Sequence, residues 1–171
     1  MSVFNLAGKN LVLIGMPGVG KSTIGVLLAK ELSRSFLDTD VFIQSQESRR
    51  LREIIRDEGM NVFRALEERY ILTLDCREHV IATGGSVVYS PAAMEHLRSD
   101  GVLVHLSLPI DILATRIGDL NARGVVRSDG QSLPDLYAER MPLYARYRDA
   151  EVECAGQSHE QVVAAILRLL N

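Results

Sequence analysis

Residues 15–23 read Gly-Met-Pro-Gly-Val-Gly-Lys-Ser-Thr, which contains the Gly-x-x-x-x-Gly-Lys-Ser spacing of a phosphate-binding loop. An apolar run from Leu11 to Ile14 precedes this stretch and suits a buried strand. After it, apolar side chains recur from Ile24 to Leu32 with the period of a helix. The motif therefore lies between a strand and a helix N-terminus, where backbone N–H groups and the helix dipole favour an anion.

This loop predicts a site for a nucleoside triphosphate. Lys21 can reach the β- and γ-phosphates, and the Ser22 hydroxyl can bind Mg²⁺. The residues expected to contact the nucleotide here are Gly15, Pro17, Gly18, Val19, Gly20, Lys21, Ser22 and Thr23. A glycine-rich turn that merely precedes Lys-Ser is the alternative, and the strand before and helix after argue against it. The loop alone does not specify the reaction.

Length and composition indicate one ordinary globular domain, spanning residues 1–171. A net charge of −3 gives no basic field for nucleic acid. No apolar run approaches the ~20 residues of a membrane span, and the first ten residues lack a signal-peptide pattern. Cys76 and Cys154 have no metal-type spacing and suit reduced thiols. We therefore expect a cytoplasmic protein with neither nucleic acid nor membrane as a partner.

Strand-like and helix-like segments alternate along the chain, which predicts a parallel sheet covered on both faces. Strands are expected at 11–14, 36–37, 79–82, 101–106 and 152–154, and helices at 23–33, 41–47, 49–58, 61–74, 91–97, 109–117, 133–149 and 160–170, with Asn61 and Ser90 as N-caps. Residues 118–132 lack periodicity and are rich in Gly, Asn and Asp, so a mobile loop is expected there. Ligands bind beyond the strand C-termini in such sheets, so chemistry should converge at that edge.

Asp38 and Asp40 follow the second expected strand, two residues apart, so on a strand they would point the same way. One can hold Mg²⁺ through water, while the other orients a hydroxyl and accepts its proton. The alternative is a polar turn that caps the next helix.

Other residues suit an acidic acceptor. Arg64 and Arg140 can bind a carboxylate. Each can instead be a surface arginine, and Arg64 would then pair with Glu67 three residues later. Gly84 and Gly85 let backbone N–H groups approach a ligand, or form a plain turn. Further arginines, which either close over a triphosphate or lie on a solvated loop, are Arg116, Arg123 and Arg127.

The sequence resembles the shikimate kinase family over nearly the whole chain. The first matching positions are residues 15–23 with Gly25, Leu28 and Ala29, followed by Phe36, Asp38 and Asp40 of a Phe-x-Asp-x-Asp motif. A Gly-Glu-x-x-Phe-Arg-x-x-Glu motif, without its first Glu, is matched by Gly59, Phe63, Arg64 and Glu67. The last matches are Thr83, Gly84 and Gly85 of a triple-glycine turn, and Arg140, Pro142, Leu143 and Tyr144 of an Arg-x-Pro-Leu-Tyr motif. Arg116 and Arg123 keep the spacing of the family's adenine-side and lid arginines. The order and spacing of these pieces carry the resemblance.

The resemblance implies a three-layer α/β/α P-loop kinase fold, with a five-stranded parallel sheet of order 2-3-1-4-5, helices on both faces and a mobile lid at about 118–132. It implies a monomer that transfers the γ-phosphoryl of ATP to a hydroxyl of shikimate, a carboxylated polyol, in aromatic amino-acid synthesis.

The resemblance also implies residue roles. Lys21 and the loop amides would hold the triphosphate, and Ser22 with Asp38 would position Mg²⁺. Asp40 would bind ring hydroxyls and act as the base. Arg64 and Arg140 would grip the carboxylate, with Glu67 bracing Arg64. Backbone at Gly84 and Gly85 would line the acceptor site, and Arg123 would close with the lid as a catalytic group.

Several positions depart from the family pattern. Ser86 replaces the third glycine of the turn. If that position needs a positive φ, a serine there would cost about 1 kcal/mol of stability. The serine also brings a hydroxyl near the acceptor. Met60 and Gln44 replace Glu, and Gly124 follows Arg123 where the family has Pro. In residues 155–158 no arginine can flank adenine, so Gln157 is expected to stand in. These departures leave open a kinase for another small hydroxy-acid, or a nucleotide-binding domain without phosphoryl transfer.

Overall fold

The computed structural model describes residues 4–118, 125–128 and 130–170. Its strands form one parallel sheet in the order β2-β3-β1-β4-β5, which confirms the predicted topology. The strands are β1 (Asn10–Ile14), β2 (Ser35–Asp38), β3 (His79–Ala82), β4 (Gly101–Ser107) and β5 (Ala150–Glu153).

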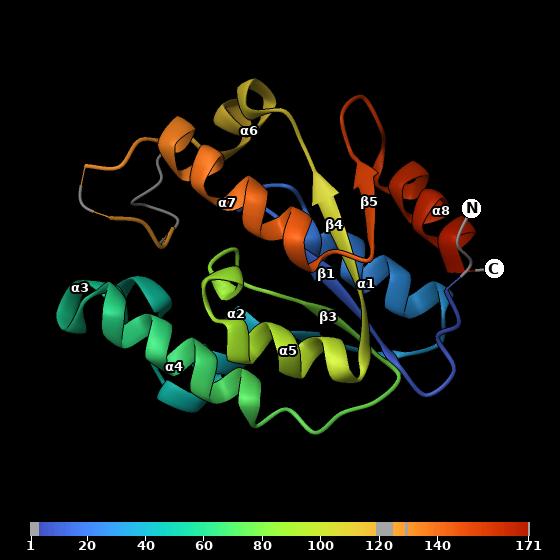
Figure 1. The fold of residues 1–171 in the computed structure, drawn as a ribbon, viewed down its shortest axis with the longest axis horizontal. Coiled ribbons are helices and arrows are strands. Elements are labelled where there is room, and N and C mark those ends of the chain that lie inside the picture. The colour runs from blue at the N-terminus through green and yellow to red at the C-terminus, as the bar shows by residue number, and fades with distance from the viewer. Residues whose placement is uncertain (1–3, 119–124, 129, 171) are drawn as a thin grey trace.

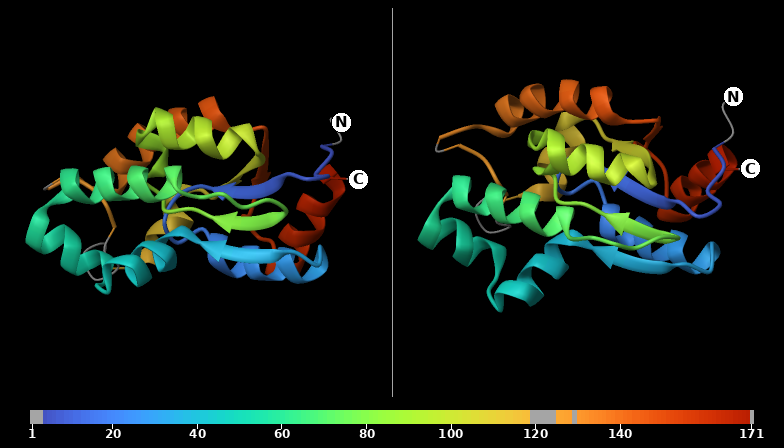
Figure 2. Two further views of the ribbon diagram at one scale, coloured as in Figure 1. Left: turned by 90° about the horizontal axis from the view of Figure 1, so that it is seen from below. Right: turned by 60° about the horizontal axis from the view of Figure 1, so that its bottom comes forward.

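Helices cover both faces of this sheet, as Figures 1 and 2 show. They are α1 (Lys21–Glu31), α2 (Thr39–Glu47), α3 (Leu51–Glu58), α4 (Met60–Leu72), the short 3₁₀ helix η1 (Val87–Tyr89), α5 (Pro91–Ser99), α6 (Ile110–Ile117), α7 (Leu133–Tyr147) and α8 (His159–Leu170). Helices α5 and α7 pack on one face, and α1 and α8 on the other. None of the described helices has the length and apolar character that crossing a membrane requires.

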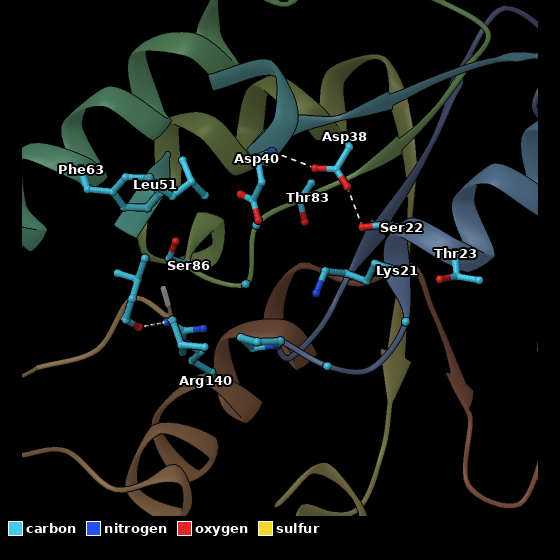
Figure 3. A pocket seen from close by; sticks show the side chains of 17 residues that line it. Lys21, Ser22, Thr23, Asp38, Asp40, Leu51, Phe63, Thr83, Ser86 and Arg140 are labelled. Atoms are coloured by element: carbon cyan, nitrogen blue, oxygen red, sulfur yellow. Dashed lines mark hydrogen bonds between the residues drawn. The ribbon is translucent and has the colours of Figure 1, made fainter. Parts of the chain in front are cut away.

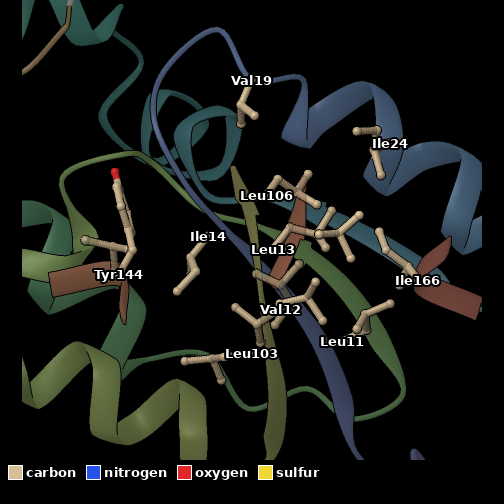
Figure 4. Packing of buried hydrophobic residues seen from close by; sticks show 14 of the residues in the cluster. Leu11, Val12, Leu13, Ile14, Val19, Ile24, Leu103, Leu106, Tyr144 and Ile166 are labelled. Atoms are coloured by element: carbon tan, nitrogen blue, oxygen red, sulfur yellow. The ribbon is translucent and has the colours of Figure 1, made fainter. Parts of the chain in front are cut away.

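The core lies on both sides of the central strands, and Figure 4 shows part of it. All of Leu11–Ile14 is 0% exposed, which explains why β1 reads as an unbroken apolar run instead of an alternating one. Leu103 and Leu106 of β4 pack beside β1, and Ile166 of α8 belongs to the same buried cluster. This packing fixes the strand ends from which the site is built.

Several helices start one or two residues away from their predicted positions, and two of these differences bear on the site. Gly59, not Asn61, precedes the first residue of α4, and its φ of +86° suits a glycine. At the end of β2, Asp38 is the last strand residue and also the N-cap of α2, so Asp40 lies in the first helical turn and not on a strand. Ser90 caps α5 as predicted, accepting a hydrogen bond from the Ala93 N–H at 3.0 Å.

Helices α2, α3 and α4 form an arm beside the carboxyl edge of the sheet (Figure 1). A second, smaller apolar cluster holds it together, formed by Ile54, Phe63 and Val126. Val126 belongs to the predicted loop 118–132, whose described residues form neither helix nor strand. Residues 119–124 and 129 lie outside the described part, so the mobility of this loop stays a prediction.

Candidate active site

One cavity of about 470 Å³ opens at the carboxyl edge of the sheet, between the phosphate loop, the α2–α4 arm, the turn after β3 and helix α7 (Figure 3). The predicted site residues that line it are Pro17, Gly18, Gly20, Lys21, Ser22, Thr23, Asp38, Asp40, Gly84, Gly85, Ser86 and Arg140. Side chains from distant parts of the sequence thus face one space.

Glycines give the phosphate loop its path from β1 into α1. Gly15 has a φ of +145°, and a Cβ there would lie 2.5 Å from the Leu106 carbonyl oxygen, so the loop passes directly against β4. Gly20 is the N-cap of α1 with a φ of +106°. These conformations favour glycine, and Gly20 to Thr23 line the cavity, so the N-terminus of α1 lies beside it, as an anion site requires.

Lys21 carries a cation into this loop. Its Nζ donates to the carbonyl oxygens of Gly15 at 2.7 Å and Met16 at 2.9 Å, and the residue is only 8% exposed. Burial lowers the pKa of Lys21 to about 8, helped by the Arg140 charge and opposed by Asp40. A bound triphosphate would favour the protonated form, because an opposite charge raises the pKa of an ammonium.

Ser22 and Asp38 place two oxygen ligands beside the loop. The Ser22 hydroxyl donates to Asp38 Oδ2 at 2.6 Å, so lone pairs of its oxygen remain available. Asp38 Oδ1 meanwhile accepts from the N–H groups of Asp40 and Val41 at 3.0 and 3.2 Å. Mg²⁺ bound with substrate phosphates uses one or two protein oxygens, so this pair fits that ion.

Asp40 faces the cavity from α2 (Figure 3). Burial raises its pKa to about 6; the nearby Asp38 carboxylate raises it further, and Lys21 opposes both. A carboxylate with this pKa is ionised near neutral pH and still basic enough to accept a proton from a hydroxyl.

The glycine turn after β3 forms the wall opposite the phosphate loop. A Cβ at Gly84 would lie 2.5 Å from Glu67 Oε1 and 2.7 Å from Asp40 Oδ1. At Gly85 it would lie 2.9 Å from an Arg140 nitrogen, Nη1, and equally close to the Pro17 ring. Any larger residue at either position would displace these side chains, which come from α2, α4, α7 and the phosphate loop and pack directly on the turn.

Ser86 occupies this turn without strain. Its φ is −89°, so the cost expected for a positive φ does not arise. The Ser86 hydroxyl, on a residue 3% exposed, donates to Glu67 Oε2 at 2.7 Å. Burial raises the pKa of Glu67 to about 7, and the hydrogen bond from Ser86 opposes that rise. Glu67 therefore pairs with Ser86, and neither the predicted brace nor the alternative surface pair with Arg64 forms.

Arg140 is completely buried, at 0% exposed. Its Nη2 donates to the Val126 carbonyl oxygen and its Nε to the Tyr89 hydroxyl at 3.2 Å, while Nη1 has no hydrogen-bond partner. Helix α7 is itself pinned to the turn, because the Tyr144 hydroxyl donates to the Gly85 carbonyl oxygen at 2.7 Å. The arrangement leaves one cationic donor group of Arg140 available to an anion.

Arg64 reaches the same neighbourhood without lining the cavity. Its Cζ lies 4.1 Å from the centroid of the Tyr89 ring, and its buried Nε has no hydrogen-bond partner. Arg140 Cζ lies 5.2 Å from the same centroid. Sequence reasoning missed Tyr89, because nothing local in the sequence marks an aromatic side chain that two distant arginines share.

Comparison with known proteins agrees with this geometry. The family model described as shikimate kinase matches residues 17–171. A shikimate kinase of Persephonella marina is 31% identical over 160 residues, covering 93% of this chain and 97% of the relative. One from Thermosynechococcus vestitus is 37% identical over 144 residues, covering 82% and 78%. The chain belongs to the shikimate kinase family. It is an ATP-dependent kinase that phosphorylates a hydroxyl group.

Solved structures of the family share the fold. The shikimate kinase from Acinetobacter baumannii, solved in complex with shikimate, superposes with a TM-score of 0.89 at 29% identity and covers 96% of this chain and 94% of its own. The likeness extends over the whole sheet and its covering helices, so the cavity described here lies in a family fold.

Some residues that the family resemblance singles out lie outside the cavity lining. Arg116 on α6 is exposed, with its Cβ 4.0 Å from where a Cβ of Gly18 would be. Gln157 is exposed and donates to the Glu153 carbonyl oxygen at 2.5 Å. Gly15 and Val19 support the loop without lining the cavity. Arg123 and Gly124 lie outside the described residues.

Apolar groups complete the lining, and their role was missing from the expected site. Leu51, Phe63, Val125 and Val126 line the cavity together with Thr83. In the sequence, Leu51 and Phe63 stand out only as members of the apolar faces of expected helices. An apolar helix face can pack in the core or line a cavity, so this pattern does not identify them as lining residues.

Proposed function

We propose that this chain transfers the γ-phosphoryl group of ATP to a hydroxyl of shikimate, giving shikimate 3-phosphate and ADP, as in aromatic amino-acid biosynthesis. The observation that carries the proposal is the buried Arg140 guanidinium, whose Nη1 has no partner beside a cavity that also holds Lys21 and Asp40. Leaving a charged donor unpaired in a buried position costs about 1–3 kcal/mol or more. A carboxylate on the acceptor would remove that cost.

The reaction follows from which groups face the cavity. The triphosphate lies on the loop N–H groups with Lys21 at its terminal end, and the acceptor carboxylate lies on Arg140 and Arg64. The acceptor hydroxyl oxygen then attacks the γ-phosphorus while the bond from that phosphorus to the bridging oxygen of ADP breaks. The hydroxyl proton passes to Asp40. Because the reactants are held in place, positioning supplies much of the rate.

Ser22 and Asp38 would hold Mg²⁺ together with the phosphates. The ion neutralises negative charge on the β- and γ-phosphates when bound. We further propose Arg123 as the lid arginine that stabilises charge during transfer, Arg116 and Gln157 as the adenine-side residues, and Glu67, Gly84, Gly85 and Ser86 as contacts or close supports of the acceptor.

We propose that residues 1–171 form a single monomeric domain that works in the cytoplasm. One continuous apolar cluster runs through the described sheet and both helix layers, which supports a single domain. Both cysteines are free, which suits a reducing compartment.

The direct test measures ADP release with MgATP in the presence of shikimate, of other small hydroxy-acids, and of no acceptor. Shikimate is expected to give the highest kcat/KM, and Asp40→Asn to remove the acceptor-dependent release. ADP release that no acceptor increases would contradict the proposal. A better acceptor than shikimate would replace it with the other hydroxy-acid kinase, although Ser86 no longer motivates that alternative, because Glu67 occupies its hydroxyl.

A further inference from the structure

We propose that Tyr89 is a positioning residue of the acceptor site, which holds the Arg64 and Arg140 guanidiniums at one place and leaves their free N–H groups for the acceptor carboxylate. This inference rests on the proposed function, since it assigns Tyr89 a part in recognising the acid group.

The position of Tyr89 in the fold links the relevant elements. It ends η1, which follows directly after the glycine turn that lines the cavity. Helix η1 packs against both α4 and α7, the helices that carry Arg64 and Arg140. A side chain placed there reaches both arginines without entering the cavity lining itself.

The aromatic ring meets both cations within the range of cation–π attraction. The Cζ atoms of Arg64 and Arg140 lie 4.1 and 5.2 Å from its centroid, and the limit is roughly 6 Å. Two guanidiniums brought together repel each other, and the negative face of a ring offsets part of that repulsion. Tyr89 therefore supports a concentration of positive charge that the protein would otherwise resist.

Binding through the ring leaves hydrogen-bond donors unused. A cation–π contact engages no N–H group, so attraction to the ring consumes none of a guanidinium's hydrogen-bond donors. Arg64 Nε and Arg140 Nη1 are both buried and without partners. A carboxylate at Arg64 in place of Tyr89 would have consumed such donors.

The Tyr89 hydroxyl fixes the orientation of Arg140. It accepts from Arg140 Nε at 3.2 Å and donates to Glu139 Oε1. Glu139 Oε2 in turn accepts from the Gln131 side-chain amide at 2.8 Å. Because Nε and Nη2 are both engaged, Nη1 is the group of Arg140 that remains for the acceptor.

The chain contains a matched control in Tyr70 on α4. Arg69 Cζ lies 4.7 Å from the centroid of its ring, and its hydroxyl donates to Glu47 Oε1 at 2.6 Å. Both tyrosines are half-buried, and both combine an arginine over the ring with a glutamate on the hydroxyl. The arginine and glutamate around Tyr70 do not line the cavity, so the same substitution there removes similar contacts without touching the acceptor site.

The experiment measures KM and kcat for shikimate, and KM for MgATP, in the wild type and in Tyr89→Leu, Tyr89→Phe and Tyr70→Leu. Tyr89→Leu should raise the KM for shikimate by about five- to thirtyfold, since it removes two cation–π contacts, one of them to the fully buried Arg140. The KM for MgATP and kcat should change by less than about threefold. Tyr89→Phe keeps the ring and should recover most of the loss, leaving about a threefold rise from the missing hydroxyl. Tyr70→Leu should leave all three constants near their wild-type values.

A second acceptor distinguishes positioning from general damage. In the carboxamide of shikimate the charge on the acid group is absent, so the Tyr89→Leu and Tyr89→Phe effects on KM should largely disappear with it. Equal effects on the acid and the amide would overturn the proposal, as would an unchanged KM for shikimate in Tyr89→Leu. If Tyr89→Leu does not fold, Tyr89→Phe tests the hydroxyl's hold on Arg140: its roughly threefold rise in KM should appear with the acid and disappear with the amide, and any other result overturns the proposal. A wild type that does not phosphorylate shikimate would instead refute the proposed function.

Discussion

The phosphate loop and the acceptor wall face each other across one cavity, yet they are assembled in different ways. The loop is a single stretch of chain whose anion-binding groups are backbone N–H groups, and Lys21 is held by carbonyl oxygens five and six residues away. The acceptor wall combines α2, α4, the turn after β3 and α7, and its polar groups are side chains that hold one another.

This difference predicts how the two walls respond to substitution. Backbone groups survive a change of side chain, so damage to the loop is confined to the few side chains that contact the nucleotide. On the acceptor wall, each side chain supports another, so removing one leaves a buried partner unsatisfied. Substitutions in the loop should affect nucleotide and turnover together, and those in the acceptor wall mainly the acceptor.

The largest effect is expected for Lys21→Ala. Lys21 is the buried cation of the phosphate loop, and cationic groups at this position of a phosphoryl transfer are worth about 10³-fold or more in turnover. We expect kcat to fall by at least about that factor and MgATP binding to weaken, while shikimate binding, measured by calorimetry without nucleotide, changes little.

Lys30→Ala is the matched control, because Lys30 lies in the last turn of the same helix and is exposed. It should retain wild-type kinetics. A Lys21→Ala variant that loses shikimate affinity as strongly as MgATP affinity would show that the two walls are not independent.

A smaller effect, on the other wall, separates the two arginines. Arg140→Ala removes a fully buried cation and leaves the Tyr89 hydroxyl without one of its partners, so it should cost about 2–5 kcal/mol in acceptor binding. Arg64→Ala should lie at the lower end of that range, because Arg64 is half-buried and lies outside the cavity lining. The KM for shikimate measures both, with kcat and the KM for MgATP expected to change far less.

Arg146→Ala provides the comparison on the same helix as Arg140, since Arg146 is exposed and lies over the Tyr147 ring. Its kinetics should match the wild type. If Arg64→Ala weakens the acceptor more than Arg140→Ala, burial does not rank the two groups, and Arg64 must enter the cavity when the acceptor binds.

The contrast between the walls also explains what could be predicted from the sequence. The phosphate loop followed from local spacing and periodicity, and the strand order from the family resemblance, and the structure reproduces both. Asp40 was expected on a strand, but capping by Asp38 begins α2 at Thr39, two residues before the predicted start. The sequence offered both a strand end and a helix cap at this point, and local spacing could not decide between them.

The acceptor wall was harder to predict because its contacts join residues far apart in the chain. Ser86 and Glu67 are separated by 19 positions, and Tyr89 and Arg140 by 51. Residue type gave Arg140 a candidate role, but only the fold shows that Glu67 turns to Ser86 and that Tyr89 meets both arginines. Side-chain partners of this kind depend on packing, which local patterns do not encode.

The smallest expected effect is a dependence on pH that arises where the two walls meet. The Asp40 carboxylate must be ionised to accept the acceptor's proton, and its pKa is raised to about 6 by burial and by Asp38, against the opposing charge of Lys21. The ionised fraction therefore falls about tenfold for each pH unit below that value, and kcat/KM for the acceptor should fall with it. The profile should be recorded between about pH 5 and 8 at subsaturating MgATP, so that it describes the protein before nucleotide alters the local charge.

Glu67 also titrates in this range, with a pKa of about 7. Glu67→Gln removes that second titration, and it should preserve the acidic fall if Asp40 is the base. The fall should stay near pH 6, because Glu67, with a pKa of about 7, is already mostly protonated where Asp40 titrates. A profile that stays flat to pH 5 in both proteins would exclude Asp40 as the base and return the proton acceptor to solvent or to the phosphate itself.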